Sequence, residues 1–285
     1  MIQKLSASVF SATGNYREIN QDNYYLNGSV LTDVNKPRIH KHTSVIDGLF
    51  AVCDGMGGEN DGEIASRLVV DSLGEYDPED NIREIISKAN NKICQHIIET
   101  KNNSGSTLVM AAIENFKADI YNIGDSRCYL IRGNDITQLS KDHTLTNDLV
   151  QAGKLTEEEA RSDKRRHQLT QHLGIFPEEM SISVYHKTVE LFENDILLMC
   201  TDGLSDVLTN EEILEIVKDN DNTNTLALEL AEDALNNGSK DNVTAMVVKV
   251  RRDQKEELIR MLYILICVCS GLIGGITALI TLFLL

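Results

Sequence analysis

The chain has 285 residues, 42% of them hydrophobic, which is enough to bury the core of one large domain or two small ones. Its formal net charge of -17 argues against a nucleic-acid partner, because phosphate backbones are bound by clustered Lys and Arg. The acidic excess suits metal cations better. Six cysteines without any C-x-x-C spacing indicate neither a zinc site nor a disulfide framework.

Strand-like patterns outnumber helical patterns along the chain. The predicted strands span residues 4–11, 46–53, 107–113, 118–123, 126–132, 181–188, 196–200 and 243–250. A helix is predicted from Asp77, which can act as its cap, to Thr100, because isoleucines recur on one face of this segment.

Two further helices are expected where Thr is followed three residues later by Glu, which is capping-box spacing. These pairs are Thr156 with Glu159 and Thr209 with Glu212. Adjacent strands are often joined by short turns, and the helices come in blocks rather than after every strand. The order of elements therefore favours an α+β domain with mainly antiparallel sheets.

The last hydrophobic run is a separate object. Residues 261–285 contain no charged side chain, and a helix of this length would span a hydrocarbon core of about 30 Å. We expect a single-pass C-terminal transmembrane anchor rather than a buried core helix. The basic juxtamembrane segment 251–260 places the preceding domain, residues 1–250, on the cytoplasmic side. Gly271 and Gly275 form a G-x-x-x-G pair that could support a weak dimer.

Five aspartates lie beside strand-like segments. Asp54, Asp202 and Asp241 each adjoin an apolar run and have Gly or Asn next to them, and Asp22 and Asp125 resemble them. Each one alone is more often a turn residue than a ligand. Five together suit Mg²⁺ or Mn²⁺, and several carboxylates can hold two cations about 3.5 to 4 Å apart.

An EF-hand is the competing metal site. The stretch DNDNTNTLALEL, residues 219–230, lacks the central Gly and the Glu at its twelfth place, which excludes that reading.

Seven ordered motifs resemble those of the bacterial branch of the metal-dependent (PPM, type 2C) protein serine/threonine phosphatases. They are REINQD, AVCDGMGG, GSTLVMAAI, NIGDSRCYLI, LSKDHT, LLMCTDGLSD and SKDNVTAMVV, and they run from about residue 6 to about residue 250. The resemblance implies a four-layer αββα sandwich of two mainly antiparallel sheets flanked by helices. It also implies that residues 1–250 form a phosphatase catalytic domain.

The resemblance assigns the metal ligands by position. Asp54 would bridge two cations, Mn²⁺ or Mg²⁺, and the Gly55 carbonyl would bind one of them. Asp202 and Asp241 would complete the ligand set, while Asp22 would act mainly through metal-bound water.

The same resemblance gives two more roles. Asp125 would help Asp202 to hold a third, weaker cation, and Arg17 would grip the substrate phosphate, which suits its bidentate donor geometry. The implied reaction is hydrolysis of phosphoserine or phosphothreonine by a metal-activated water, with Asp54 and Arg17 as the catalytic residues.

The chain departs from the family pattern at two positions. Met56 stands where many eukaryotic members have a His, and a thioether cannot donate a proton, so the general acid is unassigned. Gln21 stands where Glu is frequent.

His143 is left out of the catalytic set, because a lone His is more often structural. Residues 144–172 correspond to a variable flap, whose basic cluster at 164–167 could meet acidic substrates or an anionic leaflet, or could be a solvated loop.

Three functions compete at this point. The first is a membrane-tethered phosphatase acting on phosphorylated Ser/Thr proteins, opposing a Ser/Thr kinase. The second is a catalytically silent module of the same fold that binds a partner at the membrane, and the retained acids argue against it. The third is a two-metal nuclease, which should present a basic groove to its substrate and is disfavoured by the acidic balance.

Overall fold

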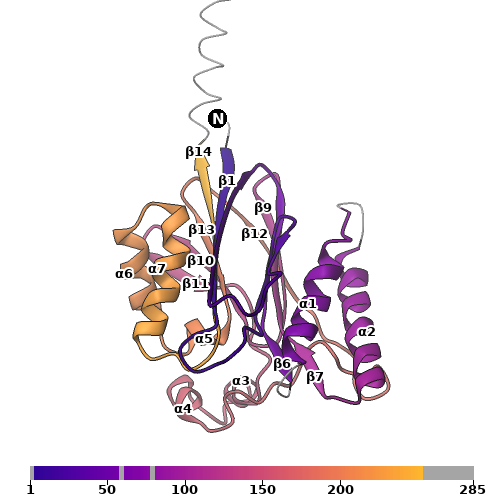
Figure 1. Ribbon diagram of the computed structural model, residues 1–285. Coiled ribbons are helices and arrows are strands. Elements are labelled where there is room, and N and C mark those ends of the chain that lie inside the picture. Colours follow the sequence, from indigo (N-terminus) through magenta and orange to yellow (C-terminus); the bar gives the residue numbers. More distant parts are fainter. Residues whose placement is uncertain (1–2, 58–60, 78–80, 253–285) are drawn as a thin grey trace, which may run out of the picture.

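A computed structural model describes residues 3–57, 61–77 and 81–252 (Figure 1). Its strands are β1 (Gln3–Ala12), β2 (Asn23–Leu26), β3 (Ser29–Val30), β4 (Arg38–Val45), β5 (Gly48–Cys53), β6 (Gly55–Gly57), β7 (Ser104–Ser106), β8 (Leu108–Glu114), β9 (Lys117–Ile123), β10 (Arg127–Arg132), β11 (Asp135–Gln138), β12 (Tyr185–Glu190), β13 (Ile196–Cys200) and β14 (Val243–Arg252). Its helices are α1 (Gly62–Leu73), α2 (Ile82–Thr100), α3 (Leu145–Gln151), α4 (Glu157–Ser162), α5 (Asp202–Ser205), α6 (Asn210–Asp219) and α7 (Thr223–Asn236).

The strands form two antiparallel six-stranded sheets and one small ribbon. Sheet A has the order β11-β10-β13-β14-β1-β4, and sheet B has the order β12-β9-β8-β5-β2-β3. The ribbon pairs β6 with β7. In sheet A the two ends of the described chain meet, because β1 pairs with β14 along its whole length.

The layers follow from which faces of the sheets are apolar. One buried cluster, including Val9, Phe50 and Met246, fills the space between sheets A and B. A second packs the outer face of sheet A against α5, α6 and α7, and a third packs the outer face of sheet B against α1 and α2. Figure 1 shows these helices on opposite sides of the paired sheets, so the predicted sandwich of two antiparallel sheets flanked by helices is confirmed.

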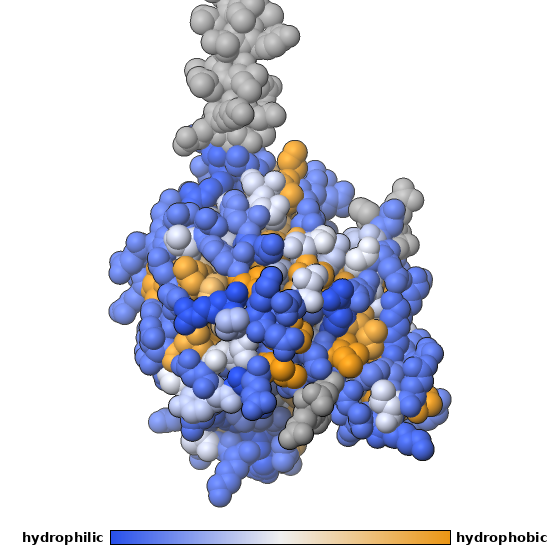
Figure 2. Space-filling model, in the orientation of Figure 1, coloured by the Kyte–Doolittle hydropathy of each residue, from blue (hydrophilic) through white to orange (hydrophobic). Residues whose placement is uncertain are grey.

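The interior, rather than the visible surface, holds most of the large apolar side chains. Figure 2 shows one face of the molecule as mainly hydrophilic, with apolar side chains in small separate groups. Helices α3 and α4 lie at the end of the sandwich where α5, β6 and β7 also lie (Figure 1).

Most predicted strands are confirmed to within two residues at each end. The exception is the segment predicted at 181–188, because β12 begins only at Tyr185. Its partner β9 ends at Ile123, where Gly124 turns the chain with φ +96°, so residues 181–184 have no strand opposite them. The described β14 continues through Arg252, two residues past the predicted end of the domain at 250.

The predicted helices are confirmed with one change. Both capping boxes are present, at Thr156 in α4 and at Thr209 in α6. The cap of α2, however, is Asn81 rather than Asp77, because the Asn81 side chain accepts a hydrogen bond from the Arg83 amide at 3.1 Å.

The predicted membrane anchor, residues 261–285, lies outside the described residues, as do Gly271 and Gly275. Among the residues that the structure covers, no helix combines the length and apolar character needed to cross a bilayer. The anchor and the weak dimer therefore remain predictions.

Candidate metal centre

All five predicted aspartates gather at one end of the sandwich. Asp54 directly follows β5 of sheet B, and Asp22 directly precedes β2 of the same sheet. Asp202 opens α5 after β13 of sheet A, Asp241 lies two residues before β14, and Asp125 lies in the turn from β9 to β10. The site is therefore built from both sheets, and no contiguous stretch of sequence contains it.

Asp54 is at the centre of this group. Burial raises its pKa well above the ordinary value, and the charges of Asp22, Asp202, Asp125 and Asp241 raise it further. Four carboxylates thus act on a fifth within a short distance. Divalent cations bound among these carboxylates would favour their ionised forms.

Asp22 is 1% exposed and held by two hydroxyl groups. The Thr244 hydroxyl donates to its Oδ2 at 2.7 Å, and the Thr201 hydroxyl donates to the same oxygen at 2.9 Å. Burial raises the pKa of Asp22 to about 8, although these hydrogen bonds lower it. The two threonines fix the carboxylate without neutralising it.

The backbone of Gly55, directly after Asp54, lies against the backbone of Gln21 and Gly62. The Gly55 amide donates to the Gln21 carbonyl at 3.1 Å. A Cβ on Gly55 would lie 2.0 Å from the Gly62 carbonyl oxygen and 2.6 Å from that of Gln21, so no larger residue fits. The resemblance gives Gly55 a role as a carbonyl ligand, and the structure adds the packing of β6 against the start of α1.

Arg17 reaches the same end of the sandwich from the segment after β1. Its Nη2 donates to Asp241 Oδ2 at 2.6 Å, and this hydrogen bond raises the pKa of Arg17, with smaller contributions from the charges of Asp54 and Asp202. Half of the Arg17 side chain is exposed. The guanidinium is therefore both close to the acids and open to solvent.

Asn242, which the sequence analysis missed, ties these segments together. Its side-chain oxygen accepts from the Gln21 amide at 2.8 Å, and its nitrogen donates to the carbonyls of Thr13 (2.8 Å) and Ile19 (3.0 Å). The only signal available in the sequence was its position directly after Asp241.

A groove of about 530 Å³ opens beside Asp125 and Asp202. Helices α3, α4 and α5 contribute to its wall, together with Arg166, His167 and Asp206. Burial, followed by the charge of Asp202, raises the pKa of Asp125 to about 8. The predicted flap segment 144–172 thus does line the site.

One observation that does not depend on any sequence motif shows that these residues suit divalent cations. One oxygen of Asp202, Oδ1, is buried and has no hydrogen-bond partner among the described residues. An orphaned carboxylate oxygen beside other buried carboxylates is costly unless a cation takes it. Carboxylate oxygens are the ligands that Mg²⁺ and Mn²⁺ prefer.

His143 has the structural role that the sequence analysis expected. His143 Nδ1 accepts from the Gly124 amide at 3.1 Å, and its own amide donates to the Gly124 carbonyl at 2.9 Å. Burial lowers its pKa. Such a neutral, internally bonded His is structural. Met56 lies in β6 opposite Gly105.

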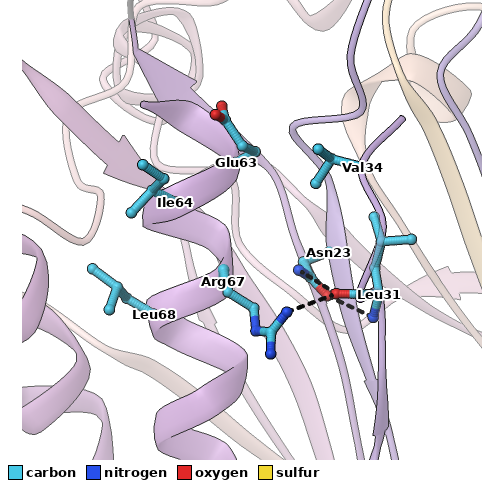
Figure 3. Close-up of a pocket in the computed structure, with 7 residues that line it drawn as sticks. All are labelled: Asn23, Leu31, Val34, Glu63, Ile64, Arg67 and Leu68. Carbon is cyan, nitrogen blue, oxygen red and sulfur yellow. Dashed lines mark hydrogen bonds between the residues drawn. The ribbon is translucent and has the colours of Figure 1, made fainter. Parts of the chain in front are cut away.

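A second, smaller hollow of about 190 Å³ lies along α1 (Figure 3). It is lined by Asn23, Leu31, Val34, Glu63, Ile64, Arg67 and Leu68. Arg67 is held by the Leu31 carbonyl at 3.3 Å and by Asp71 at 2.7 Å. None of the five clustered aspartates lines this hollow, so the candidate chemistry belongs to the metal centre.

The chain is similar to known proteins in both sequence and fold. The profile of the family described as "Protein phosphatase 2C" matches residues 29–149 and 184–243. The chain is 33% identical over 269 residues to Protein phosphatase PhpP of Streptococcus pneumoniae, covering 88% of this chain and all of that protein. It is 34% identical over 224 residues to the serine/threonine protein phosphatase PstP of Mycobacterium tuberculosis, covering 75% of this chain and 43% of PstP.

Solved structures show the same architecture. The crystal structure of M. tuberculosis PstP matches with a TM-score of 0.74 and 29% identity, over 87% of this chain and all of that one. The PstP catalytic domain in complex with two manganese ions matches with a TM-score of 0.72 and 28% identity, over 88% of this chain and all of that one. Stp1 of Staphylococcus aureus matches with a TM-score of 0.73 and 29% identity, over 85% and 94%.

The chain belongs to the protein phosphatase 2C family of metal-dependent phosphatases. It is a protein serine/threonine phosphatase of the bacterial type, and its cofactors are two divalent cations, Mn²⁺ or Mg²⁺.

Proposed function

We propose that this phosphatase hydrolyses phosphoserine and phosphothreonine residues of proteins at a membrane, opposing a Ser/Thr kinase, with the residues predicted above as its metal ligands and phosphate clamp. The observation that carries the catalytic part is the cluster of five aspartates, in which Asp22 is buried and Asp202 Oδ1 is buried with no hydrogen-bond partner among the described residues. A catalytically silent module has no need to hold five carboxylates so close together with one of them fully buried.

The roles of the acids are those that the family resemblance implies, and their positions support them. Asp54, central in the group, would bridge the two cations, with the Gly55 carbonyl, Asp202 and Asp241 as further ligands. Asp22 would act through water, because its Oδ2 already accepts two threonine hydroxyls. When bound, the cations supply Lewis acidity that lowers the pKa of water and offsets phosphoryl charge.

Arg17 would bind the phosphoryl oxygens. A guanidinium has five donors, and its contact with Asp241 uses Nη2, so other donors are available to a second anion. Its charge then stabilises the transition state, where negative charge spreads over the phosphoryl oxygens. Met56 cannot protonate the leaving Ser or Thr oxygen, so we assign that proton to solvent.

The test is hydrolysis of a phosphothreonine peptide by the full chain in detergent, with Mn²⁺, with Mg²⁺ and with a chelator. We expect phosphate release that the chelator stops and that Asp202→Ala abolishes. Asp233→Ala, at an exposed position of α7, is the matched control and should retain activity. A folded wild-type protein inactive with either metal, on the peptide and on an aryl phosphate, would leave the silent module as the function.

The membrane location rests on the uncharged run 261–285 and on the positive-inside rule. Two of the basic residues of segment 251–260 lie close to acids, because Arg251 pairs with Asp221 at 3.2 Å and Arg252 lies 3.6 Å from Glu193. The positive charge that would orient the anchor therefore comes mainly from Lys255 and Arg260.

Cell fractionation tests this location. The full chain should resist alkaline extraction from membranes, and a chain ending at Arg252 should appear in the supernatant. Protease added to intact cells should leave the catalytic domain uncut if it faces the cytoplasm. Full chain released by alkaline extraction would contradict the anchor.

A further inference from the structure

Three side chains from distant parts of the chain converge beside the metal centre. Asp125, His167 and Asp202 each offer one ligand atom, and these atoms lie within 4.8 Å of one another. Asp125 comes from the β9–β10 turn, Asp202 from the start of α5, and His167 from the segment after α4. The separation suits a single cation bound by all three.

Both ring nitrogens of His167 point toward aspartates, Asp202 and Asp206. Its Nδ1 lies 3.5 Å from Asp202 Oδ2, and its Nε2 lies 3.5 Å from Asp206 Oδ2. Both distances are long for hydrogen bonds, whereas Nε2 accepts from Arg166 Nε at 2.8 Å. A cation bound at Nδ1 would displace this contact, because the imidazole would then carry its proton on Nε2. The partnerless Asp202 Oδ1 is an independent sign that this corner lacks a positive partner.

We propose that His167 is a ligand of a third cation together with Asp125 and Asp202, that its imidazole makes this site prefer Mn²⁺ over Mg²⁺, and that the bound cation fixes residues 163–170 over the groove. The inference rests on the metal-dependent activity proposed above. The sequence assigned a third cation to the two aspartates alone, and His167 was seen only as part of a basic cluster.

The preference follows from ligand chemistry. Mg²⁺ takes oxygen ligands and keeps much of its water, whereas imidazole nitrogen binds Mn²⁺ and later transition metals more readily. A third site made of two aspartates and water would discriminate little between Mg²⁺ and Mn²⁺. The imidazole adds the nitrogen that separates them.

The effect on the segment follows from how few contacts join its first residues, 163–167, to the rest of the protein. Helix α4 has no buried residue, and Arg166 is held by the Arg161 carbonyl at 3.0 Å and lies 3.4 Å from Asp206. Downstream, the Gln168 carbonyl accepts from the Leu145 amide at 2.9 Å. The Thr170 amide also donates to the His143 carbonyl at 2.8 Å, so residues 168–170 are held by backbone hydrogen bonds. A metal bond from His167 would therefore add a tether to residues 163–167, upstream of them.

Two measurements on the full chain in detergent test the proposal. Pulsed electron paramagnetic resonance of protein loaded with up to three Mn²⁺ reports coupling between Mn²⁺ and the ¹⁴N of a bound imidazole. Limited trypsin digestion reports cleavage after Lys164, Arg165 and Arg166, which lie on the same segment. Neither readout depends on turnover.

We expect a ¹⁴N coupling in the wild type that is absent in His167→Asn. We also expect Mn²⁺ to slow cleavage after residues 164–166 by about tenfold at ten times its dissociation constant, with Mg²⁺ giving less protection. His172→Asn is the matched control, because His172 lies two residues beyond this segment and its Nδ1 is 3.0 Å from the Leu173 carbonyl. It should retain both the coupling and the protection.

The failures are distinguishable. Wild-type protein that hydrolyses the phosphopeptide but shows no ¹⁴N coupling overturns this inference and leaves the proposed function intact. Coupling that persists in His167→Asn also overturns it, because another imidazole would then be the ligand. Equal protection of the wild type and His167→Asn by Mn²⁺ overturns the tether.

Discussion

Asp22 shows how a single residue ties the metal centre to the stability of the fold. Burial raises its pKa to about 8 from the ordinary 3.8, because the hydroxyls of Thr201 and Thr244 do not replace the water that an ionised carboxylate loses. Asp54 and Asp125 are shifted in the same direction. The metal-free fold therefore carries carboxylates that resist ionisation.

This gives a pH dependence with a definite sign. Between about pH 4 and about pH 8 the folded, metal-free protein binds more protons than the unfolded chain, so its free energy of unfolding falls as pH rises. Thermal unfolding in chelator should give a lower Tm at pH 8 than at pH 6. Asp22→Asn should flatten the dependence, and exposed Asp71→Asn should not. A Tm that rises over this range would contradict the assignment.

Arg17 gives the second prediction at this scale. Arg17→Ala should lower kcat/KM for a phosphopeptide by about a hundredfold, because a donor to the phosphoryl oxygens is lost. Arg38→Ala is the matched control, since Arg38 is equally exposed and pairs with Glu232 at 2.8 Å. Steady-state kinetics with saturating Mn²⁺ measures both. Equal kinetics for the two variants would remove Arg17 from the phosphate site.

At the scale of elements, two helices share the same cap but differ in packing. Thr209 of α6 and Thr156 of α4 each make a complete capping box, with their hydroxyls accepting from the third helical amide at 3.2 Å. Helix α6 packs Ile213 into the core of sheet A, whereas α4 buries no residue. The sequence predicted both helices but could not tell which one supports the fold.

The difference predicts unequal effects of the same mutation. Thr209→Ala should destabilise the protein by about 1 kcal/mol, which lowers Tm by roughly 2 to 4 °C for a domain of this size. Thr156→Ala should leave Tm unchanged and raise the rate of tryptic cleavage after Lys164, because α4 can unfold locally while the rest of the protein stays folded. Calorimetry and limited digestion measure the two effects. Equal Tm shifts would show that α4 is part of the cooperative unit.

Elements were predictable where their own pattern carried the information. Strand β13 is apolar throughout and was predicted at its observed bounds. Strand β4, RIHKHTSV, was missed, because as the edge of sheet A it is largely exposed and shows no apolar alternation. Its strand structure comes from pairing with β1, which is a tertiary contact.

At the scale of the whole molecule, the aspartates could be predicted and their supports could not. Asp54, Asp202 and Asp241 were recognised from their motifs. The contacts of Asn242 with Gln21, 221 residues away in sequence, and of His167 with Asp202 could not be recognised, although Asn242 and Gln21 lie in motifs themselves. Such pairings depend on how sheet A meets sheet B. The sequence holds no local record of them.

The meeting of the two sheets also determines how cations stabilise the molecule. Asp54 belongs to sheet B, and Asp202 and Asp241 belong to segments that extend sheet A, so cations bound by all three join the sheets. Bound at one hundred times its dissociation constant, Mn²⁺ should add about 2.7 kcal/mol, or roughly 5 to 10 °C in Tm.

Asp54→Asn should abolish the stabilisation by Mn²⁺, because it removes the charge on which four other carboxylates act. The metal-free variant should melt above the metal-free wild type, since repulsion between buried acids is relieved, yet Mn²⁺ should no longer raise its Tm. Calorimetry of a chain ending at Arg252, with chelator and with Mn²⁺, measures both effects, and Asp71→Asn should behave as the wild type. An Asp54→Asn variant still stabilised by Mn²⁺ to the wild-type extent would show that Asp54 does not bridge the cations, and the two sheets would then be joined by other ligands.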